Sequence, residues 1–383
     1  MRRFLLVALA VTACACGGPD KPVVEPQTTP PPTASAPTPP ASTVSSTTTV
    51  AKLPSEPALP PPKPTTIALA KTGDEKIDAL LAQGDKAFED GDLKAAESAY
   101  DSARKASPKK AAPIVGAARV RVAKVSPNLA FASAEKKPEV KEAAKDLRRA
   151  ADMEPGFGPA QVELGRTLLL LGDAPQAEAA LRKGVRLMPD EAEAHSALGV
   201  ALLATGKSEE AATELSRACE LDPGSAPRHG NLGTVLFMRG KVVEAIHEYE
   251  IEVRLLPDDA HAHSDLGTAL LAQSDFMRAI PELKRAIELD PKRATFRSNL
   301  GYALQLSGKV ADAVTEYRAA LKLDPNLASA WINLATALSH DPKTRGEARQ
   351  ALKTAEKLDP ADPRVKANLE ELDALEKSEK KAP

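Results

Sequence analysis

Prolines recur at a fixed spacing over most of this chain. The series is Pro108, Pro155, Pro189, Pro223, Pro257, Pro291, Pro325 and Pro360. From Pro155 to Pro325 every interval is 34 residues, whereas the first interval is 47 residues and the last is 35. A constant period of this length is typical of stacked repeats, in which each unit contacts only its neighbours. The sequence therefore predicts one elongated repeat domain, and such domains generally bind other molecules rather than catalyse reactions.

Each interval carries the pattern of two short helices. If the proline is numbered position 32, position 20 is alanine in all eight repeats and position 8 is always Gly or Ala. In one repeat, Leu198, Leu202 and Leu203 have helical spacing, and Gly206 ends the run. A second helical stretch then ends just before Pro223. Each repeat is predicted to be a helix, a tight turn and an antiparallel helix, with small residues where the two helices meet.

This pattern resembles the tetratricopeptide repeat family over roughly residues 77 to 360. The residues that carry the resemblance, together with their recurrence, are Leu198-Gly199, Ala211, Ala218 and Pro223. The resemblance implies an all-α fold, a right-handed superhelical solenoid of about eight helix pairs with a concave groove. It also implies protein or extended-peptide partners that bind in that groove.

The predicted array covers residues 73–378, with repeats ending near residues 110, 157, 191, 225, 259, 293, 327 and 362. Asp362 and Pro363 then supply an N-cap and a first-turn proline for a capping helix over 363–378. Its apolar stripe would cover the open end of the stack, as repeat arrays require for solubility. Residues 379–383 are predicted to be a disordered tail.

The first residues have the order of a secretory signal. Met1-Arg2-Arg3 precedes an apolar run over 4–13 that is too short to span a bilayer. The run ends at Cys14 and resembles a bacterial lipobox, which implies a signal peptide over 1–13 and lipidation of Cys14. Cys16 is a second candidate, and an ordinary cleaved signal with incidental cysteines is the alternative. By this resemblance, Ala15 after Cys14 favours the outer membrane, with the array facing the periplasm.

Proline, threonine and alanine dominate the region after Cys14. Residues 17–70 hold 15 of the chain's 33 prolines, and such a segment lacks the apolar content to offset its ordering entropy. We predict a disordered tether over 14–72 that holds the array away from the membrane. The alternative is a recognition segment, for a proline-binding domain or for peptidoglycan of the cell wall.

The composition argues against several functions. A net charge of −2 gives no electrostatic case for nucleic acid. The glycines follow the repeat and form no phosphate-binding loop, so no enzyme, cofactor or metal site is expected. Cys219 is predicted to be a buried free thiol. Glu252, the one charged residue at position 27, is expected to be half exposed or paired with a neighbour such as His263.

Three histidines stand at position 4 of successive repeats: His195, His229 and His263. Such a row could bind metal or sense pH. Equivalent residues of adjacent helix pairs should lie about 10 Å apart, which is too far for two imidazoles to share one zinc ion. The simpler interpretation is that position 4 accepts large side chains.

A second row, at position 6, carries Asn231, Asp265, Asn299 and Asn333. It resembles the asparagine ladder with which O-linked N-acetylglucosamine transferases bind extended peptides, although asparagine is common here across the family. An amide can bond a peptide main chain without reading its side chains. The residues predicted to contact a partner are Asn231, Thr234, Phe237, Asp265, Thr268, Asn299, Tyr302, Asn333 and Thr336.

The long first interval adds 13 residues around 124–138. Insertions in repeats map to loops, which often carry binding, but this one could equally pack over the groove. Taken together, the sequence predicts a membrane-anchored scaffold of the cell envelope. By family resemblance such lipoproteins assist the assembly of secretins or pili, or recruit hydrolases. A structural spacer with a wall-binding tether is the alternative.

Overall fold

The computed structural model of the chain describes residues 66–70, 72–125 and 137–379, and that part contains helices and turns but no strand. The paired helices, in chain order, are α2 (Glu75–Glu89) with α3 (Leu93–Ala106), α4 (Ala111–Val125) with α6 (Pro138–Met153), α7 (Gly158–Leu170) with α8 (Ala174–Leu187), α9 (Ala192–Ala204) with α10 (Ser208–Leu221), α11 (Ala226–Met238) with α12 (Val242–Leu255), α13 (Ala260–Ala272) with α14 (Phe276–Leu289), α15 (Ala294–Leu306) with α16 (Val310–Leu323), and α17 (Ala328–Ser339) with α18 (Arg345–Leu358). A last helix, α19 (Pro363–Glu379), follows.

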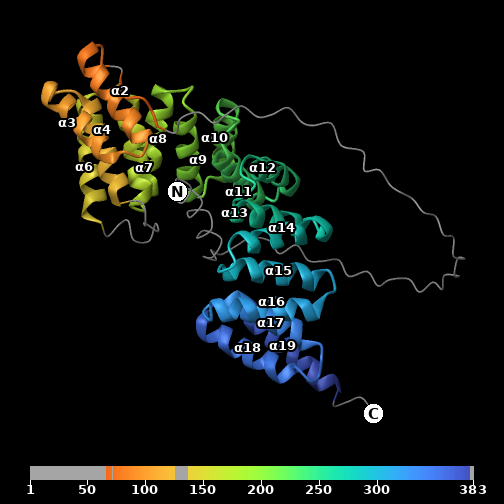
Figure 1. Ribbon diagram of the computed structural model, residues 1–383. Helices are drawn as coiled ribbons and strands as arrows, with labels where there is room; N and C mark the ends of the chain where they lie inside the picture. Colours follow the sequence, from red (N-terminus) through yellow and green to blue (C-terminus); the bar gives the residue numbers. More distant parts are fainter. Residues whose placement is uncertain (1–65, 71, 126–136, 380–383) are drawn as a thin grey trace, which may run out of the picture.

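These helices confirm the predicted all-α superhelical repeat fold. Figure 1 shows the pairs stacked one after another along an elongated, curved array from α2 to α19. The two helices of a pair pack closely, and each second helix also packs against the first helix of the next pair. The predicted signal peptide 1–13, Cys14 and the predicted tether as far as residue 65, residues 126–136 of the insertion and residues 380–383 of the predicted tail lie outside the described part of the chain. None of the described helices is long and apolar enough to cross a membrane.

The first helices form the inner layer of the curve. Neighbouring first helices touch at α2–α4, α4–α7, α7–α9, α9–α11, α13–α15 and α15–α17. Neighbouring second helices show no comparable contact in the described residues. In a curved stack the layer whose members approach each other more closely lies on the inside. We call the side of the first helices that carries positions 6 and 9 the inner face.

Small residues set the distance between the two helices of a pair. Position 20 alanines such as Ala211 and Ala313 are fully buried. At position 8, a Cβ atom on Gly301 would lie 2.7 Å from the Tyr317 ring, closer than carbon atoms can approach. The Tyr317 hydroxyl continues past the glycine and donates to Gln305 Oε1 at 2.8 Å. The glycine therefore makes room for a large position 24 side chain that crosses between the helices.

The turn inside six of the eight pairs, from α2–α3 and α7–α8 to α15–α16, contains a left-handed backbone residue. Glycine takes this place in most pairs, for example Gly206 at φ 79° and Gly308 at φ 81°. Ser274 stands at the same place with φ 62°, where a side chain costs about 1 kcal/mol or more. The tight turn is therefore kept by the repeat geometry even where glycine is replaced.

Replacing Gly301 with alanine should destabilise the array by about 1–3 kcal/mol, because the added methyl group collides with the Tyr317 ring. Gly346 is the matched control: it is also helical, and a Cβ atom there meets nothing within 4 Å. Urea denaturation followed by circular dichroism measures both variants. An equal effect of Gly301→Ala and Gly346→Ala would contradict the packing argument.

Candidate functional site

The position 6 row lies along the inner face of the second half of the array. Asn231, Asp265, Asn299 and Asn333 come from α11, α13, α15 and α17, at the same place in each first helix. The Asn299 Nδ2 atom lies 3.5 Å from Ser264 Oγ and 3.4 Å from Thr268 Oγ1, so α15 meets the preceding first helix here. The structure therefore brings the predicted row together on one surface.

Asn231 is the most buried member of this row, with 6% of its surface exposed. Its amide nitrogen Nδ2 is buried and has no hydrogen-bond partner among the described residues. A buried donor without a partner costs about 1–3 kcal/mol. Because this nitrogen is itself covered, a partner carbonyl could bond it only if the neighbouring side chains moved aside.

Asp265 is the one acid in the row. Burial, reinforced by the nearby negative charge of Asp259, raises the pKa of Asp265 to about 7. No hydrogen bond or ion pair joins its carboxyl group to another side chain in residues 66–70, 72–125 or 137–379. A cation or a hydrogen-bond donor on a partner would stabilise the ionised form there.

The position 9 residues differ in how many hydrogen bonds they already make within the chain and in how exposed they are. Thr234 donates to the Gly230 carbonyl and accepts from the Tyr249 hydroxyl. Tyr302 is 44% exposed and stands beside the row as an apolar surface. Thr336 accepts at 2.9 Å from Asn368 of α19, so the last helix already uses its hydroxyl.

The remaining predicted contacts are less open to a partner than Tyr302. Thr268 donates to the Ser264 carbonyl at 2.8 Å, and Phe237 is half-buried against the core. The accessible part of the predicted set is thus centred on Asp265, Asn299 and Tyr302, and Asn231 is covered.

The first half of the inner face carries a buried network of charges that the sequence analysis missed. It alternates in sign across successive first helices, and its members are Asp85, Arg119, Glu163, Arg166, Glu193, Arg228 and Asp222. The distances between charged atoms run from 2.9 Å for Arg119–Glu163 to 3.4 Å for Arg166–Glu163, and Arg228 pairs closely with Asp222. The available signal was arginine at position 9, in Arg119 and Arg166, where every later repeat has an uncharged residue.

The network shifts the ionisation of its members in opposite directions. Burial by itself would raise the pKa of Glu163, but Arg119 and Arg166 outweigh it and hold that pKa below its ordinary value. Burial prevails at Asp85, whose pKa is raised although Leu69, Arg119 and Tyr100 oppose the change. Most charges in this half are therefore balanced internally, in contrast to the largely uncharged second half.

Comparison with known proteins agrees with this architecture. A sequence model of the tetratricopeptide repeat matches residues 134–187, 162–226, 264–328 and 307–363, which together make up half of the chain. The chain belongs to the tetratricopeptide repeat family. No curated protein sequence matches it.

Several solved tetratricopeptide structures are similar to this array. The Cut9–Hcn1 hetero-tetramer of APC/C aligns with a TM-score of 0.55 and 18% identity, over 80% of this chain and 57% of that one. YrrB, described as having an unusual peptide-binding site, aligns with a TM-score of 0.41 and 23% identity, over 50% of this chain and 99% of that one. PilF of Pseudomonas aeruginosa aligns with a TM-score of 0.47 and 20% identity, over 56% of this chain and 97% of that one. This chain spans less than two thirds of the Cut9–Hcn1 chain, and that likeness supports the fold alone.

The position 4 histidines have a shared structural role in the tetratricopeptide array. In each, Nδ1 lies 2.6–2.7 Å from a glutamate of the second helix and Nε2 lies 2.9–3.0 Å from the carbonyl of the proline six residues earlier. The sets are His195 with Glu214 and Pro189, His229 with Glu248 and Pro223, and His263 with Glu282 and Pro257. Trp331 donates to Pro325, and Arg297 to Glu316, at the same place in later repeats. Position 4 therefore ties the first helix to the second helix of its pair, to the proline that ends the preceding repeat, or to both.

Two acceptors on one imidazole favour the charged ring. Burial lowers the pKa of His195, but the bonds to Glu214 and to the Pro189 carbonyl outweigh it, so the pKa is raised. The possible pairing of Glu252 with His263 is wrong, since His263 bonds Glu282. Glu252 is also not half exposed, because only 6% of its surface is accessible.

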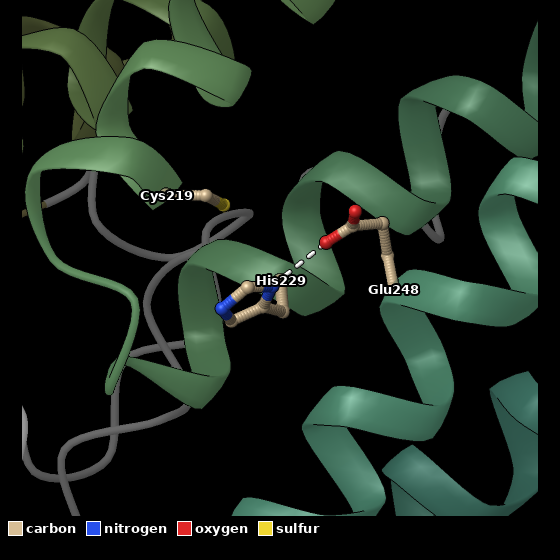
Figure 2. Close-up of side chains that lie close together, drawn as sticks. All are labelled: Cys219, His229 and Glu248. Carbon is tan, nitrogen blue, oxygen red and sulfur yellow. Dashed lines mark hydrogen bonds and ion pairs between the residues drawn. The ribbon is translucent and has the colours of Figure 1, made fainter. Parts of the chain in front are cut away.

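One histidine also has a thiol beside it. Figure 2 shows Cys219 with His229 and Glu248, and their ligand atoms all lie within 4.8 Å of one another. Cys219 is a buried free cysteine, and burial raises the pKa of its thiol, so the thiol keeps its proton at neutral pH. A metal ion would have to displace that proton and break the 2.7 Å His229–Glu248 bond. The two neighbouring repeats have valine in place of Cys219, and the absence of a metal stays a prediction.

Replacing Asp265 with asparagine should stabilise the array at high pH by roughly 1–2 kcal/mol. The folded pKa of about 7 lies above the ordinary value of 3.8, so the folded state holds the extra proton between these values. The unsubstituted chain then loses stability as pH rises through this range, and the gain of the D265N variant grows until about pH 7. Urea denaturation from pH 4.5 to 8.5 measures this, with the exposed Asp312 changed to asparagine as control. A gain that does not change with pH would contradict it.

Proposed function

We propose that this protein is a membrane-anchored tetratricopeptide adaptor that holds an extended segment of another protein against the inner face between α11 and α17. The tetratricopeptide repeat family, to which the chain belongs, typically provides scaffolds for protein interactions. The observation that carries the proposal is the position 6 row, whose half-buried members Asp265, Asn299 and Asn333 recur on successive first helices with the exposed Tyr302 beside them.

The row suits an extended main chain. Each asparagine amide offers a donor and an acceptor, and equivalent first helices repeat that offer along the array. Tyr302, 44% exposed, supplies apolar contact area at low entropic cost. The partner therefore binds mainly through its main chain, with one aromatic contact.

Asp265 would favour a positively charged residue on the partner segment. Its pKa of about 7 shows that the ionised carboxylate is poorly stabilised in the folded chain. A lysine or arginine of the partner would supply the missing countercharge and would be favoured over an acidic residue by several-fold or more. We infer a partner segment with a basic residue between those that contact Asn231 and Asn299.

The proposed location rests on the first residues of the sequence. Cys14 follows a charged and then apolar segment, and the proline-rich region after it extends the reach of the array. Lipidation there would place the array at a bacterial envelope membrane, with the outer membrane as the proposed site. Assembly of a pilus, a secretin or another envelope complex is the process that such an adaptor would serve.

A structural spacer is the second candidate. The 15 prolines in residues 17–70 favour it, because a stiff, extended segment can hold two envelope layers apart or bind peptidoglycan. In that case the array would capture no partner, and the isolated tether would sediment with peptidoglycan.

Changing Asn299 and Tyr302 to alanine together should lower partner capture at least tenfold while leaving the helical circular dichroism intact. Both side chains lie on the inner face, and among the described residues Asn299 makes only two long side-chain hydrogen bonds, of 3.4–3.5 Å to α13, so its removal should cost little stability. The measurement is photo-crosslinking from the inner face in native cells, with crosslinked partners quantified by mass spectrometry. Met277→Ala is the matched control, since Met277 is 87% exposed on the second helix α14. Unchanged capture by the double variant would move the site elsewhere.

Substitution of Cys14 by serine should abolish incorporation of a labelled fatty acid and release the protein from the membrane fraction. Cys16→Ser is the control and should leave both unchanged. Label that persists in the Cys14→Ser variant, or that is lost only in Cys16→Ser, would overturn the assignment of the lipidated residue.

A further inference from the structure

A short extended segment ahead of the first helix is part of the folded array. The tether was predicted to continue to residue 72, yet Ile67 is only 2% exposed and Leu69 is fully buried. Ala68, between them, is exposed. We call residues 67–69 the strap. Its alternating burial is that of an extended chain with one face against a surface.

The inner face holds the strap by its main chain. Arg119 Nη2 donates to the Ile67 carbonyl at 2.9 Å, and the Leu69 N–H donates to Asp85 Oδ2 at 2.7 Å. In an extended chain these two groups, two residues apart, point to the same edge. One buried acid and one buried base therefore bind the donor and the acceptor of a single strand edge. We call Asp85 and Arg119 the clamp.

The clamp is also held by contacts that do not involve the strap. Asp85 Oδ1 accepts from the Tyr100 hydroxyl at 2.8 Å and from Arg119 Nη1 at 3.2 Å. Arg119 also donates to Glu163 at 2.9 Å and lies over the Phe88 ring at 5.7 Å. Helices α2, α3, α4 and α7 all contribute to this arrangement. A site that is already ordered loses little entropy when a segment binds.

None of the clamp's hydrogen bonds reaches a side chain of the strap. Any residue can make the two main-chain hydrogen bonds, except that proline cannot donate at the position of Leu69. Selectivity for sequence therefore depends on the two buried apolar side chains, Ile67 and Leu69. The clamp stands at position 9, the place that Thr234, Thr268 and Tyr302 occupy in later repeats. It thus belongs to the same inner face but lies at the opposite end from the row.

We propose that the clamp is a second peptide-binding site, selective for an extended segment with apolar residues two apart, and that the strap is its intramolecular ligand. Because the strap is joined directly to α2, its effective concentration is of the millimolar order, so a free peptide competes poorly until the strap is released. This proposal does not depend on the function proposed for the row between α11 and α17.

The test uses the full chain and a fluorescein-labelled peptide with the sequence of residues 64–73. Leu69→Asp places a charge where the strap is fully buried, and it should release the strap while leaving the helix pairs folded. Fluorescence anisotropy should then show at least tenfold tighter peptide binding than to the unsubstituted chain. Ala68→Asp is the matched control, because Ala68 is exposed in the same segment, and it should bind like the unsubstituted chain.

A change in the peptide checks the site without altering the protein. The same peptide with Leu69→Asp should bind the released chain at least tenfold more weakly than the original peptide. Ile67→Ser provides a second released variant that removes the other apolar contact. Hydrogen exchange should show the amides of residues 66–70 protected in the unsubstituted chain and unprotected in both released variants.

Three outcomes would overturn the proposal. The first is equal peptide binding by the Leu69→Asp and Ala68→Asp chains. The second is equal binding of the original and the Leu69→Asp peptides to the released chain. The third is loss of helical circular dichroism in both Leu69→Asp and Ile67→Ser, which would make residues 67–69 an integral part of the core. Failure of the Asn299 and Tyr302 experiment would leave these measurements unaffected.

Discussion

The rest of the structure depends on how closely the two helices of each pair approach. Alanine at position 20 and Gly or Ala at position 8 leave only enough space for one large side chain, such as Tyr317, to cross between the helices. Because the same restriction recurs every 34 residues, each pair presents its first helix in the same orientation. Side chains at equivalent positions therefore form continuous rows, and the inner face is a product of this packing. A substitution that moves the two helices of one pair apart would therefore also displace the position 4 and position 6 side chains of that pair.

The inner face is divided by the way in which its polar groups are satisfied. From Asp85 to Arg228 the chain pairs its own charges, and ionised groups such as Glu163 are stabilised by two arginines. Further along, Asn231 and Asp265 have polar atoms that are poorly stabilised by the described residues. A buried charge network gives little net stability compared with apolar packing, but it fixes geometry. The first half is thus organised around internal contacts, and the second half is where we propose that an external segment binds.

Periodicity in the sequence was sufficient to predict the repeat fold, since helical spacing, small residues and prolines all depend on contacts within one pair or between adjacent pairs. The position 6 row could be predicted for the same reason. The charge network could not be predicted in this way. Arg119 of α4 and Glu163 of α7 are 44 residues apart, with the insertion between them, and they meet only when the two first helices stack. The strap was missed because Ile67 and Leu69 are two apolar residues at the edge of a proline-rich region, where composition favours disorder. Nor does the sequence show that Cys219 lies beside His229, since that contact crosses from one repeat to the next.

The position of the strap also affects how a tether would act. A flexible chain that joins an array only through covalent continuity with its first helix leaves the array free to rotate about that joint. Here the chain is held at Ile67 by Arg119 of α4 and at Leu69 by Asp85 of α2 before it reaches α2 itself. These contacts give residues 67–69 a fixed place relative to the first two helix pairs. Under the proposal that the strap can be released, the state of the clamp therefore decides both whether a peptide can bind there and whether residues 67–69 stay fixed to the inner face.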